Sequence, residues 1–436
     1  MKRRKQLSIV CFSAVLFFLW SSCGNESDES GKKYDPSKPV QITDIEPMEG
    51  GFATKVFISG SNFGTDKSKI KVYFGETQAT VVNSSGEHLY VYSPKQDDGE
   101  RNISVVVEKD SVVYEKQKFK YTVNFVVRTI SGKKGTGEFK GGKLSEAEFH
   151  NPSTLTADKN GNVFLSHWRV PYSFVRINEE EDIAELILPG SSSDSKFALG
   201  APTVDANGVV SAISDNGSVY FSFDPNEGWT PRERSIFADN TYTRSTAHSI
   251  AAHPVTGMLY TRYYRSGQII RIDPTTREAT LEAETVASAD SYLVFDPVND
   301  NLLYIAFDNI HCIGVYNLDT KEYRVFAGAA GQSGWIDGPL KEARFNRPSQ
   351  MIVAPNGNLY VADRANHCIR EIVLPDENGD GGMVRTIIGK GGVSGYQDGN
   401  PDDALFNNPR GVAVLPDGTM YIADWENNVI RKLTQE

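Results

Sequence analysis

The last three hundred residues repeat one sequence pattern six times, and this repeat constrains the fold more than any other feature. Residues 343–363 and 404–424 match almost position for position, from a Phe-Asn-x-Pro segment to a strand ending in Ala-Asp. A third copy begins at residue 147, and weaker copies are centred on residues 205–208, 253–260 and 296–304. The copies carry turn signals such as Asn-Gly or Asp-Gly between two predicted strands, and two more strands follow. Four strands per unit, at spacings of about 45 to 60 residues, are typical of propeller blades.

The two ends of the repeat array complement each other. The last copy stops shortly after Leu433 with three predicted strands and no fourth. Residues 127–135 nearly repeat residues 384–392, which form the fourth strand of the fifth copy, yet they precede the first copy. We expect strand 126–131 to complete the sixth blade, because this closes the ring and removes an open sheet edge. The sequence therefore predicts a six-bladed β-propeller over residues 124–436.

Residues 40–122 follow a different pattern. Short runs of alternating apolar and polar residues, such as 55–60, 70–75, 88–92 and 102–107, are separated by turn residues. This pattern predicts a small antiparallel β-sandwich. Its glycines fit turns at positive φ beside a packed aromatic ring, so we expect them to serve the fold and not a site.

Two family resemblances support this division. The motifs Gly60-Ser61-Asn62-Phe63-Gly64 and Val72-Tyr73-Phe74-Gly75 resemble the IPT/TIG family of immunoglobulin-like domains. Residues 124–436 resemble the NHL-repeat propellers, and copies one, five and six match best. The resemblances imply an all-β chain, with an Ig-like β-sandwich acting as a spacer or interaction module ahead of the six-bladed β-propeller.

The N-terminus has the layout of an export signal. Four basic residues precede an apolar run that ends at Trp20, and this run is too short for a permanent membrane span. The segment ending at Cys23 resembles a bacterial lipobox, which implies a signal peptide over residues 1–22 and lipidation of Cys23. Cys11 is the weaker alternative, and an ordinary secreted protein is another. Residues 23–39 begin as a polar, acidic stretch and are expected to form a flexible tether.

The acidic start of this tether also resembles the signal that directs Bacteroidetes lipoproteins to the outer face of the outer membrane. We therefore expect a lipid-anchored, surface-exposed outer-membrane protein, with a periplasm-facing orientation as the alternative. The formal charge is −11, and a chain beginning at Cys23 would carry 41 Lys and Arg against 56 Asp and Glu, or −15. This charge argues against nucleic acid as a partner, and against membrane contact other than through the anchor.

One face of the propeller is expected to hold the binding site. Loops between the second and third strands emerge on the same face as the connections between blades, and both vary among the copies. They carry aromatic, arginine and histidine side chains suited to the faces and hydroxyl groups of sugars. The predicted ligand-binding residues are His167, Trp168, Tyr172, Tyr263, Tyr264, Arg265, Arg364, Trp425, Trp335 and Tyr396.

Some of these candidates also have a purely structural interpretation. Trp335 and Tyr396 occupy equivalent places in two copies, as repeated packing residues would. Asp363 and Asp424 also recur, and we expect them to fix loop backbone. His167 and Tyr263 stand at the positions of these aspartates and break the repeat, which favours a specific role.

We expect the chain to bind a carbohydrate or other polymer without catalysis, by analogy with Bacteroidetes glycan-uptake lipoproteins. One alternative is a protein-interaction scaffold of the cell envelope. The other is a metal-dependent lactonase or lyase with Ca²⁺ or Zn²⁺ at the propeller channel. His167, His248 and His311 have no metal-ligand spacing, and no nucleophile motif is present, so we expect no catalytic residue, resident metal or cofactor. Cys312 and Cys368 lie at equivalent outer positions of neighbouring blades, where neither a disulfide nor a shared metal site is expected.

Overall fold

The chain divides into two compact units, residues 1–122 and 123–436, which are described separately. The computed structural model describes residues 32–135, 137–190, 193–238, 241–376 and 381–435. The predicted signal peptide and Cys23 lie outside these ranges. In the described ranges, helical structure is limited to η1 (Lys67–Lys69), η2 (Ser195–Phe197), η3 (Pro225–Glu227), η4 (Arg364–Asn366) and η5 (Trp425–Asn427). None of the helices found there is long and apolar enough to cross a membrane.

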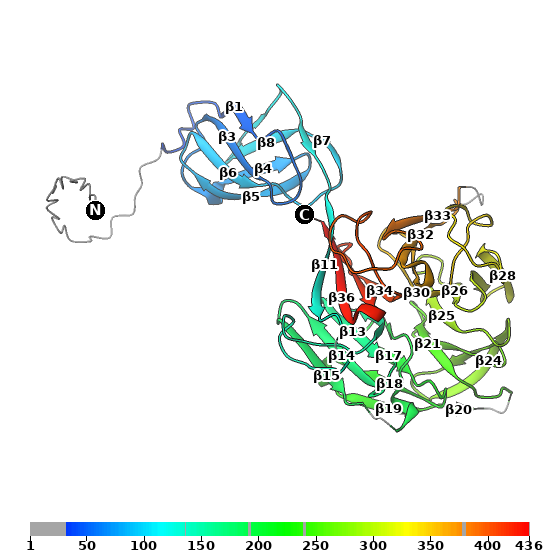
Figure 1. Cartoon of the computed structure of the whole chain (residues 1–436). Helices are drawn as coiled ribbons and strands as arrows, with labels where there is room; N and C mark the ends of the chain where they lie inside the picture. Colours follow the sequence, from blue (N-terminus) through cyan, green and yellow to red (C-terminus); the bar gives the residue numbers. More distant parts are fainter. Residues whose placement is uncertain (1–31, 136, 191–192, 239–240, 377–380, 436) are drawn as a thin grey trace, which may run out of the picture. The chain divides into compact units, whose positions relative to one another are not determined.

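The first unit is a β-sandwich (Figure 1). One sheet has the order β1 (Gln41–Glu46), β3 (Lys55–Ser61), β6 (His88–Tyr92), β5 (Thr77–Ser84), β4 (Ile70–Phe74), β8 (Ile103–Val107) and β9 (Asp110–Val113). The other has the order β2 (Glu49–Gly50), β10 (Phe119–Tyr121) and β7 (Gly99–Arg101). Phe74 and Phe119 join the two sheets through an edge-to-face contact with a centroid distance of 4.9 Å.

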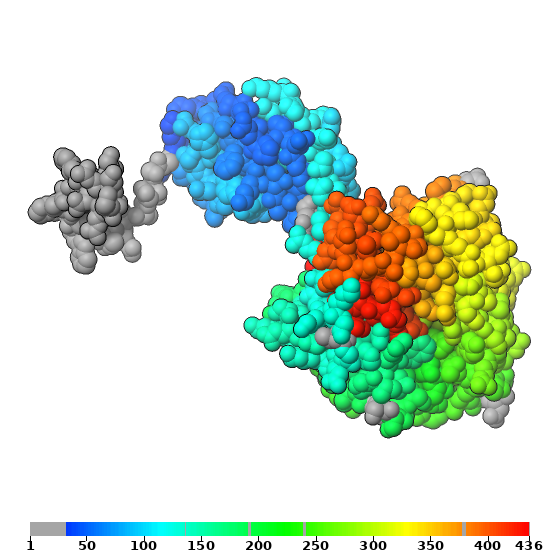
Figure 2. Space-filling view, viewed as in Figure 1, coloured from blue at the N-terminus to red at the C-terminus, as the bar shows by residue number. Residues whose placement is uncertain are grey.

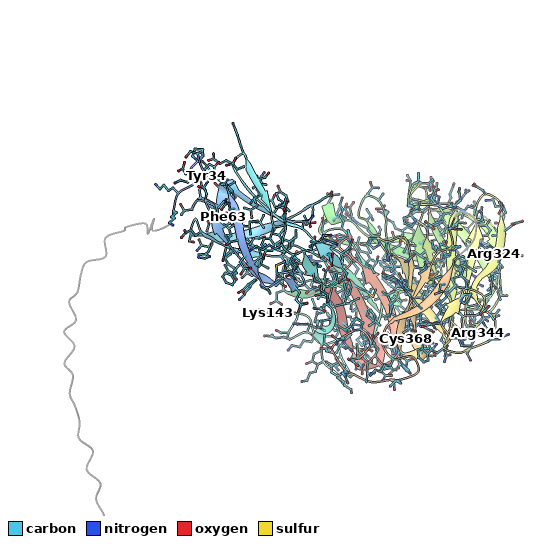
Figure 3. The ribbon with its side chains drawn as sticks, turned by 90° about the horizontal axis from the view of Figure 1, so that it is seen from above. Tyr34, Phe63, Lys143, Arg324, Arg344 and Cys368 are labelled. Carbon is cyan, nitrogen blue, oxygen red and sulfur yellow. The ribbon has the colours of Figure 1, made fainter. Side chains whose placement is uncertain are left out.

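The predicted turn chemistry of this unit is visible at residues 60–64. Asn62 and Gly64 have φ angles of 64° and 72°, and Phe63 between them is fully buried (labelled in Figure 3). The Asn62 side chain accepts a 2.7 Å hydrogen bond from the Asp35 amide and donates one of 2.9 Å to the Asp35 carbonyl. The motif therefore fastens the chain that leads into the sandwich, which explains its glycine and asparagine.

The second unit contains six sheets that follow one another along the chain (Figure 1). Blade 1 consists of β12 (Pro152–Ala157), β13 (Asn162–His167), β14 (Ser173–Asn178) and β15 (Ile183–Leu188). Blade 2 consists of β16 (Thr203–Val204), β17 (Val210–Ile213), β18 (Val219–Phe223) and β19 (Pro231–Ser235).

Blade 3 consists of β21 (Ala247–Ala252), β22 (Leu259–Tyr263), β23 (Gln268–Ile272) and β24 (Glu278–Glu284), with β20 (Phe237–Ala238) on its edge. Blade 4 consists of β25 (Ser291–Phe295), β26 (Leu302–Phe307), β27 (Cys312–Asn317) and β28 (Glu322–Gly328).

Blade 5 is β30 (Pro348–Val353), β31 (Leu359–Asp363), β32 (Cys368–Val373) and β33 (Met383–Ile388), with β29 (Gly338–Pro339) on its edge. Blade 6 is β34 (Pro409–Val414), β35 (Met420–Asp424), β36 (Val429–Gln435) and β11 (Phe125–Gly132). The first strands of successive blades contact one another, and β34 returns to contact β12. The sheets thus surround a common axis, and the predicted all-β fold class is confirmed.

Strand β11 closes the ring from the other end of the propeller sequence. It pairs antiparallel with β36, with Val127 opposite Leu433 and Arg128 opposite Lys432. Figure 2 shows the two ends of the propeller chain, cyan and red, on the same side of the domain. Thr129 donates its amide to Asp398, as Thr386 of blade 5 donates its amide to Asp337. The closing strand therefore makes the same side-chain contact as the fourth strand of a blade built from one segment.

The propeller core lies between the blades. Six clusters of buried apolar residues occupy the contacts between consecutive blades, including the contact between blades 6 and 1. Val127 belongs to the cluster between blades 5 and 6 and is fully buried. Because each blade buries apolar side chains on both faces, the ring and not the single blade is the stable unit.

Candidate functional site

Two rings of residues surround the axis on the face that carries the variable loops. In five blades the start of the first strand pairs with the end of the second, as Pro152 pairs with His167 in blade 1, and in blade 2 the isolated bridge between Leu199 and Ser214 takes this place. The residue after the first member of each pair belongs to an inner ring: Ser153, Gly200, His248, Tyr292, Ser349 and Arg410. The residue after the second member belongs to an outer ring: Trp168, Asp215, Tyr264, Asp308, Arg364 and Trp425. We call these twelve positions the loop-face mouth.

Arg410 is the central cation of the mouth. Its guanidinium lies over the ring of Trp168 at 4.3 Å and over that of Trp425 at 4.5 Å, so two tryptophans from blades 1 and 6 flank it. It donates to the Tyr292 hydroxyl through Nη2 at 3.0 Å and Nε at 3.3 Å. Arg169 adds a second guanidinium, 5.5 Å from the Trp425 ring. Arginine groups thus already contact both tryptophans, which leaves less of their surface for a stacked sugar.

His248 is held between two carboxylates. Its Nδ1 lies 3.0 Å from Asp290 and its Nε2 lies 3.2 Å from Asp215, and its ring meets Trp168 with a centroid distance of 4.9 Å. Burial disfavours the charged imidazole, but the two carboxylates outweigh burial and raise the pKa of His248 to about 9. The same contact keeps the pKa of Asp290 below its ordinary value despite burial. His248 is therefore a cation at neutral pH.

Asp308 binds two arginine side chains at the mouth. This buried carboxylate accepts from Arg347 Nε at 2.8 Å and from Arg364 Nε at 2.6 Å. Its hydrogen bonds fix two planar guanidinium groups from the neighbouring blade. The mouth therefore presents hydrogen-bonding groups in set positions, with Arg347 the more exposed of the two arginines.

The mouth is blind because the axis is blocked below it. A small cavity of about 10 Å³, with room for about one water molecule, lies among Ser153, Gly200, His248, Tyr292 and Arg410. Deeper in, the Gln350 side chain spans from blade 5 to blade 1 and binds both the amide and the carbonyl of Leu155. The loop-face mouth is thus a closed surface and not the entrance of a tunnel.

A larger cavity opens on the opposite face, below Gln350. It has a volume of about 380 Å³ and is lined mainly by apolar residues of the first strands, among them Leu155, Ile250, Leu293 and Met351. The cavity forms a funnel between the first strands of several blades, which the repeat pattern alone does not reveal.

The structure brings four of the predicted residues together. Trp168, Tyr264, Arg364 and Trp425 are all members of the outer ring, and Tyr264 lies 6.2 Å from the His248 ring. Arg265 follows Tyr264 and is exposed. Tyr172, one residue before β14, is half-buried, and no ring contact with the mouth is found for it in the described residues.

His167 and Tyr263 are core residues and not part of the mouth. The His167 ring is only 1% exposed, packs against Phe139 and Phe149, and contacts Ser173 Oγ at 2.7 Å through Nδ1. Burial lowers the pKa of His167 to about 3, so it is neutral at physiological pH. Tyr263 is fully buried, and its hydroxyl donates to the Gly217 carbonyl at 2.8 Å. Breaking the repeat at this position changes packing, because the last residue of the second strand points into the core.

Trp335 and Tyr396 lie beside the fourth strands, away from the axis. Trp335 Nε1 donates to Thr386 Oγ1 at 2.8 Å, and the Tyr396 hydroxyl accepts from Thr129 Oγ1 at 3.2 Å. Both rings remain 40% to 49% exposed. Their equivalent contacts agree with a repeated packing role, and they stand outside the mouth.

The inner ring was missed from the sequence. Its residues follow the Asn-Pro or Arg-Pro step of the clearest copies, as in Pro152-Ser153, Pro348-Ser349 and Pro409-Arg410. The change from serine to arginine at one copied position was the available signal. The position lies in the first strands and not in the variable loops, where the candidates were expected.

No group of three or more His, Cys, Asp or Glu side chains suited to a metal ion occurs in the described part of the chain. Cys312 and Cys368 begin equivalent strands, β27 and β32, and are buried free thiols (Cys368 is labelled in Figure 3). Burial raises the pKa of Cys312 to about 11 and also raises that of Cys368, so both remain protonated at neutral pH. These thiols are suited to packing and not to nucleophilic chemistry.

Known families match both units. The IPT/TIG domain family matches residues 39–121, and the NHL repeat family matches residues 345–372 and 406–433, within blades 5 and 6. The chain therefore contains an IPT/TIG domain and NHL repeats. Among curated proteins, it is 35% identical over 153 residues to Protein SUPPRESSOR OF QUENCHING 1, chloroplastic, of Arabidopsis thaliana, and 37% identical over 90 residues to NHL repeat-containing protein 2 of Gallus gallus. These matches cover 33% and 20% of this chain but only 14% and 11% of those longer proteins.

Solved structures with the same architecture come from Bacteroides. A protein of unknown function from Bacteroides thetaiotaomicron is 28% identical with a TM-score of 0.68, and an auxiliary nutrient binding protein from Bacteroides ovatus is 25% identical with a TM-score of 0.68. In both cases the match covers 93% of this chain and 100% of the other. A second auxiliary nutrient binding protein, from Bacteroides thetaiotaomicron, is 27% identical with a TM-score of 0.62 and covers 93% and 99% of the two chains.

Proposed function

We propose that this protein is a non-catalytic binding protein for a nutrient carbohydrate or a related polymer, which docks on the loop-face mouth. The observation that carries the proposal is the outer ring, in which all six blades place an aromatic or charged side chain around one blind surface. Planar groups with fixed hydrogen-bond partners suit the hydroxyl groups of sugars. The likeness to auxiliary nutrient binding proteins over the whole length of those chains supports this function.

The proposal extends to the location of the protein. Lipidation of Cys23 would place both units outside the cytoplasm, on the outer membrane, where a nutrient-binding face is useful. We expect labelled palmitate to be incorporated into the natural chain in its host and not into the Cys23→Ala variant. Equal labelling of both chains would contradict anchoring at this residue.

A glycan array tests the proposed binding. The full chain, purified in detergent, is applied to an array, and bound glycans are then titrated against the double variant Trp168→Ala, Trp425→Ala. We expect the double variant to lose at least tenfold in affinity, because both sides of Arg410 lose their support. Trp335→Ala is the matched control, since it removes a more exposed tryptophan outside the mouth. Unchanged binding by the double variant would refute the mouth as the site.

A further inference from the structure

Arg410 differs from the other cations at the mouth in what balances its charge. Arg347 and Arg364 share the carboxylate of Asp308, and His248 lies between Asp215 and Asp290. Arg410 instead contacts two indole rings and a phenol, and no ion pair with a carboxylate of the described residues is found for it. The same holds for Arg169, its neighbour over Trp425. Two guanidinium groups without a salt bridge to a carboxylate of the described residues thus stand together on a chain with a net charge of −11. The charge of Arg410 acts on Asp290 only at longer range and helps His248 to lower the pKa of that carboxyl.

The contacts of Arg410 leave one side of its guanidinium available. Its Nε and Nη2 both donate to the Tyr292 hydroxyl. The donors of Nη1 and the second donor of Nη2 remain, and together they form the edge that binds a carboxylate through two parallel hydrogen bonds. Trp168 and Trp425 restrict the plane of the group, so little side-chain entropy is lost on binding.

We propose that Arg410 is the specificity residue of the mouth and binds the carboxylate of an acidic sugar, such as a uronic acid, with Arg169 as a second positive group. This inference rests on the proposed carbohydrate function. A carboxylate is planar and carries one charge, which matches the free edge of a single guanidinium. Asp215, Asp290 and Asp308 stand in the same mouth and would repel a doubly charged phosphate group more strongly than a singly charged carboxylate.

Matched pairs of glycans test this inference. The full chain in detergent is titrated with oligogalacturonates, oligoglucuronates and sialylated oligosaccharides, and with the methyl esters of the same compounds. Methylation removes the charge and keeps the hydroxyl groups. We expect the esters of the bound glycans to bind about 10- to 100-fold more weakly, which corresponds to the loss of a charged hydrogen-bonded pair.

Substitution of Arg410 assigns the preference to this residue. Arg410→Gln should lose most of the preference for the acid over its ester, with the remainder due to Arg169, and Arg410→Lys should keep more of the preference, because the charge remains without the planar fork. Arg324→Gln is the matched control: Arg324 is exposed, lies over Phe326 at 5.5 Å on blade 4, and is labelled in Figure 3. The melting curve of Arg410→Gln shows whether this variant folds. If it does not fold, Arg410→Lys takes its place in the test.

The outcomes separate the two proposals. Equal binding of acids and esters by the natural chain would overturn the acidic-sugar inference and leave carbohydrate binding intact. Binding of no glycan at all would overturn both. A polyglutamate peptide supplies the same carboxylates on a different backbone, and binding as tight as that of the best oligosaccharide would overturn the assignment to sugar. A preference for the acid that is unchanged in Arg410→Gln, or in Arg410→Lys if Arg410→Gln does not fold, would overturn the role of this residue.

Discussion

Blades 5 and 6 carry a buried charge network at a position where blades 1 to 4 carry four different residues. In blade 5, Asp363 accepts hydrogen bonds from Arg370, Asn366 and the Asn346 amide at 2.7 to 2.8 Å. In blade 6, Asp424 accepts from Arg431, Asn427 and the Asn407 amide at 2.8 to 2.9 Å. The equivalent residues of blades 1 to 4 are His167, Ser214, Tyr263 and Phe307, all of them buried.

The comparison shows which differences between blades reach the surface. At this position every side chain is buried, so replacing aspartate by an aromatic residue or a serine alters packing alone. One residue later the side chain reaches the mouth, and there the six blades supply two tryptophans, a tyrosine, two aspartates and an arginine. If the proposed site is right, divergence therefore affects binding only where the strand geometry turns the side chain toward the mouth.

The largest expected effect concerns blade 6, which is built from both ends of the propeller sequence, whereas blade 5 is a single segment. Deleting residues 124–131 should remove most of the stability of the propeller, several kcal/mol, because it exposes the edge of β36 and the apolar cluster around Val127. Thermal unfolding and amide hydrogen exchange of residues 429–435 would measure this loss. Val127→Asp should behave similarly and Val126→Asp much less, since Val126 is only half-buried. An unchanged melting transition after the deletion would refute the closure.

The next effect compares the stability of a blade that has the buried charge network, blade 5, with that of a blade that lacks it, blade 2. Asp363→Ala should cost about 3 to 5 kcal/mol, because it leaves the fully buried Arg370 without its buried carboxylate partner. Ser214→Ala, at the equivalent position of blade 2, should change stability by less than about 0.5 kcal/mol. The Ser214 hydroxyl is buried without a hydrogen-bond partner in the described structure, so its removal costs little. Denaturant unfolding of both variants would test the contrast, and equal losses would show that the networks of blades 5 and 6 are dispensable.

Much of the fold was predictable from local sequence. The Asn-Gly and Asp-Gly turns, the alternating strands and the string shared by residues 127–135 and 384–392 indicate blades and their closure. These signals work because each blade repeats the same short-range geometry. The mouth was less predictable, because it depends on which side chains of six separate segments converge on the axis. Arg410 has no sequence neighbour that identifies it; Tyr292, its partner, is 118 residues away.

Two of the predicted binding residues are buried in the core, and the sequence alone could not show this. His167 and Tyr263 attracted attention because they break the repeat, but the burial of a position depends on the register of the strand pair and not on its variability. The funnel below Gln350 could not be predicted either, because a cavity depends on how the strands of separate blades are spaced around the axis, and no motif records that spacing.

A smaller effect concerns the charge of His248, which is protonated at neutral pH, whereas the buried His167 of blade 1 is neutral. The pKa of His248 is raised from 6.5 to about 9, so its contribution to stability is complete below about pH 6.5 and disappears as pH rises through 9. This contribution is on the order of 3 kcal/mol. We expect the natural chain to lose stability relative to His248→Gln between pH 6.5 and 9.5, measured by urea unfolding at each pH. A constant difference between the two chains across this interval would contradict the contact with Asp215 and Asp290.

The smallest effect compares the tryptophan beside a fourth strand with those of the mouth. Trp335→Ala should lower stability by about 1 to 2 kcal/mol, because it loses the hydrogen bond to Thr386 and the contact with Gly391. Ligand affinity should stay within twofold of the natural chain. Trp168→Ala should instead weaken ligand binding at least fivefold, because Arg410 loses one of its two aromatic supports. Thermal unfolding measures the stability of both variants, and glycan titration measures their ligand affinity. A loss of binding in Trp335→Ala would show that the site extends outward along blade 5.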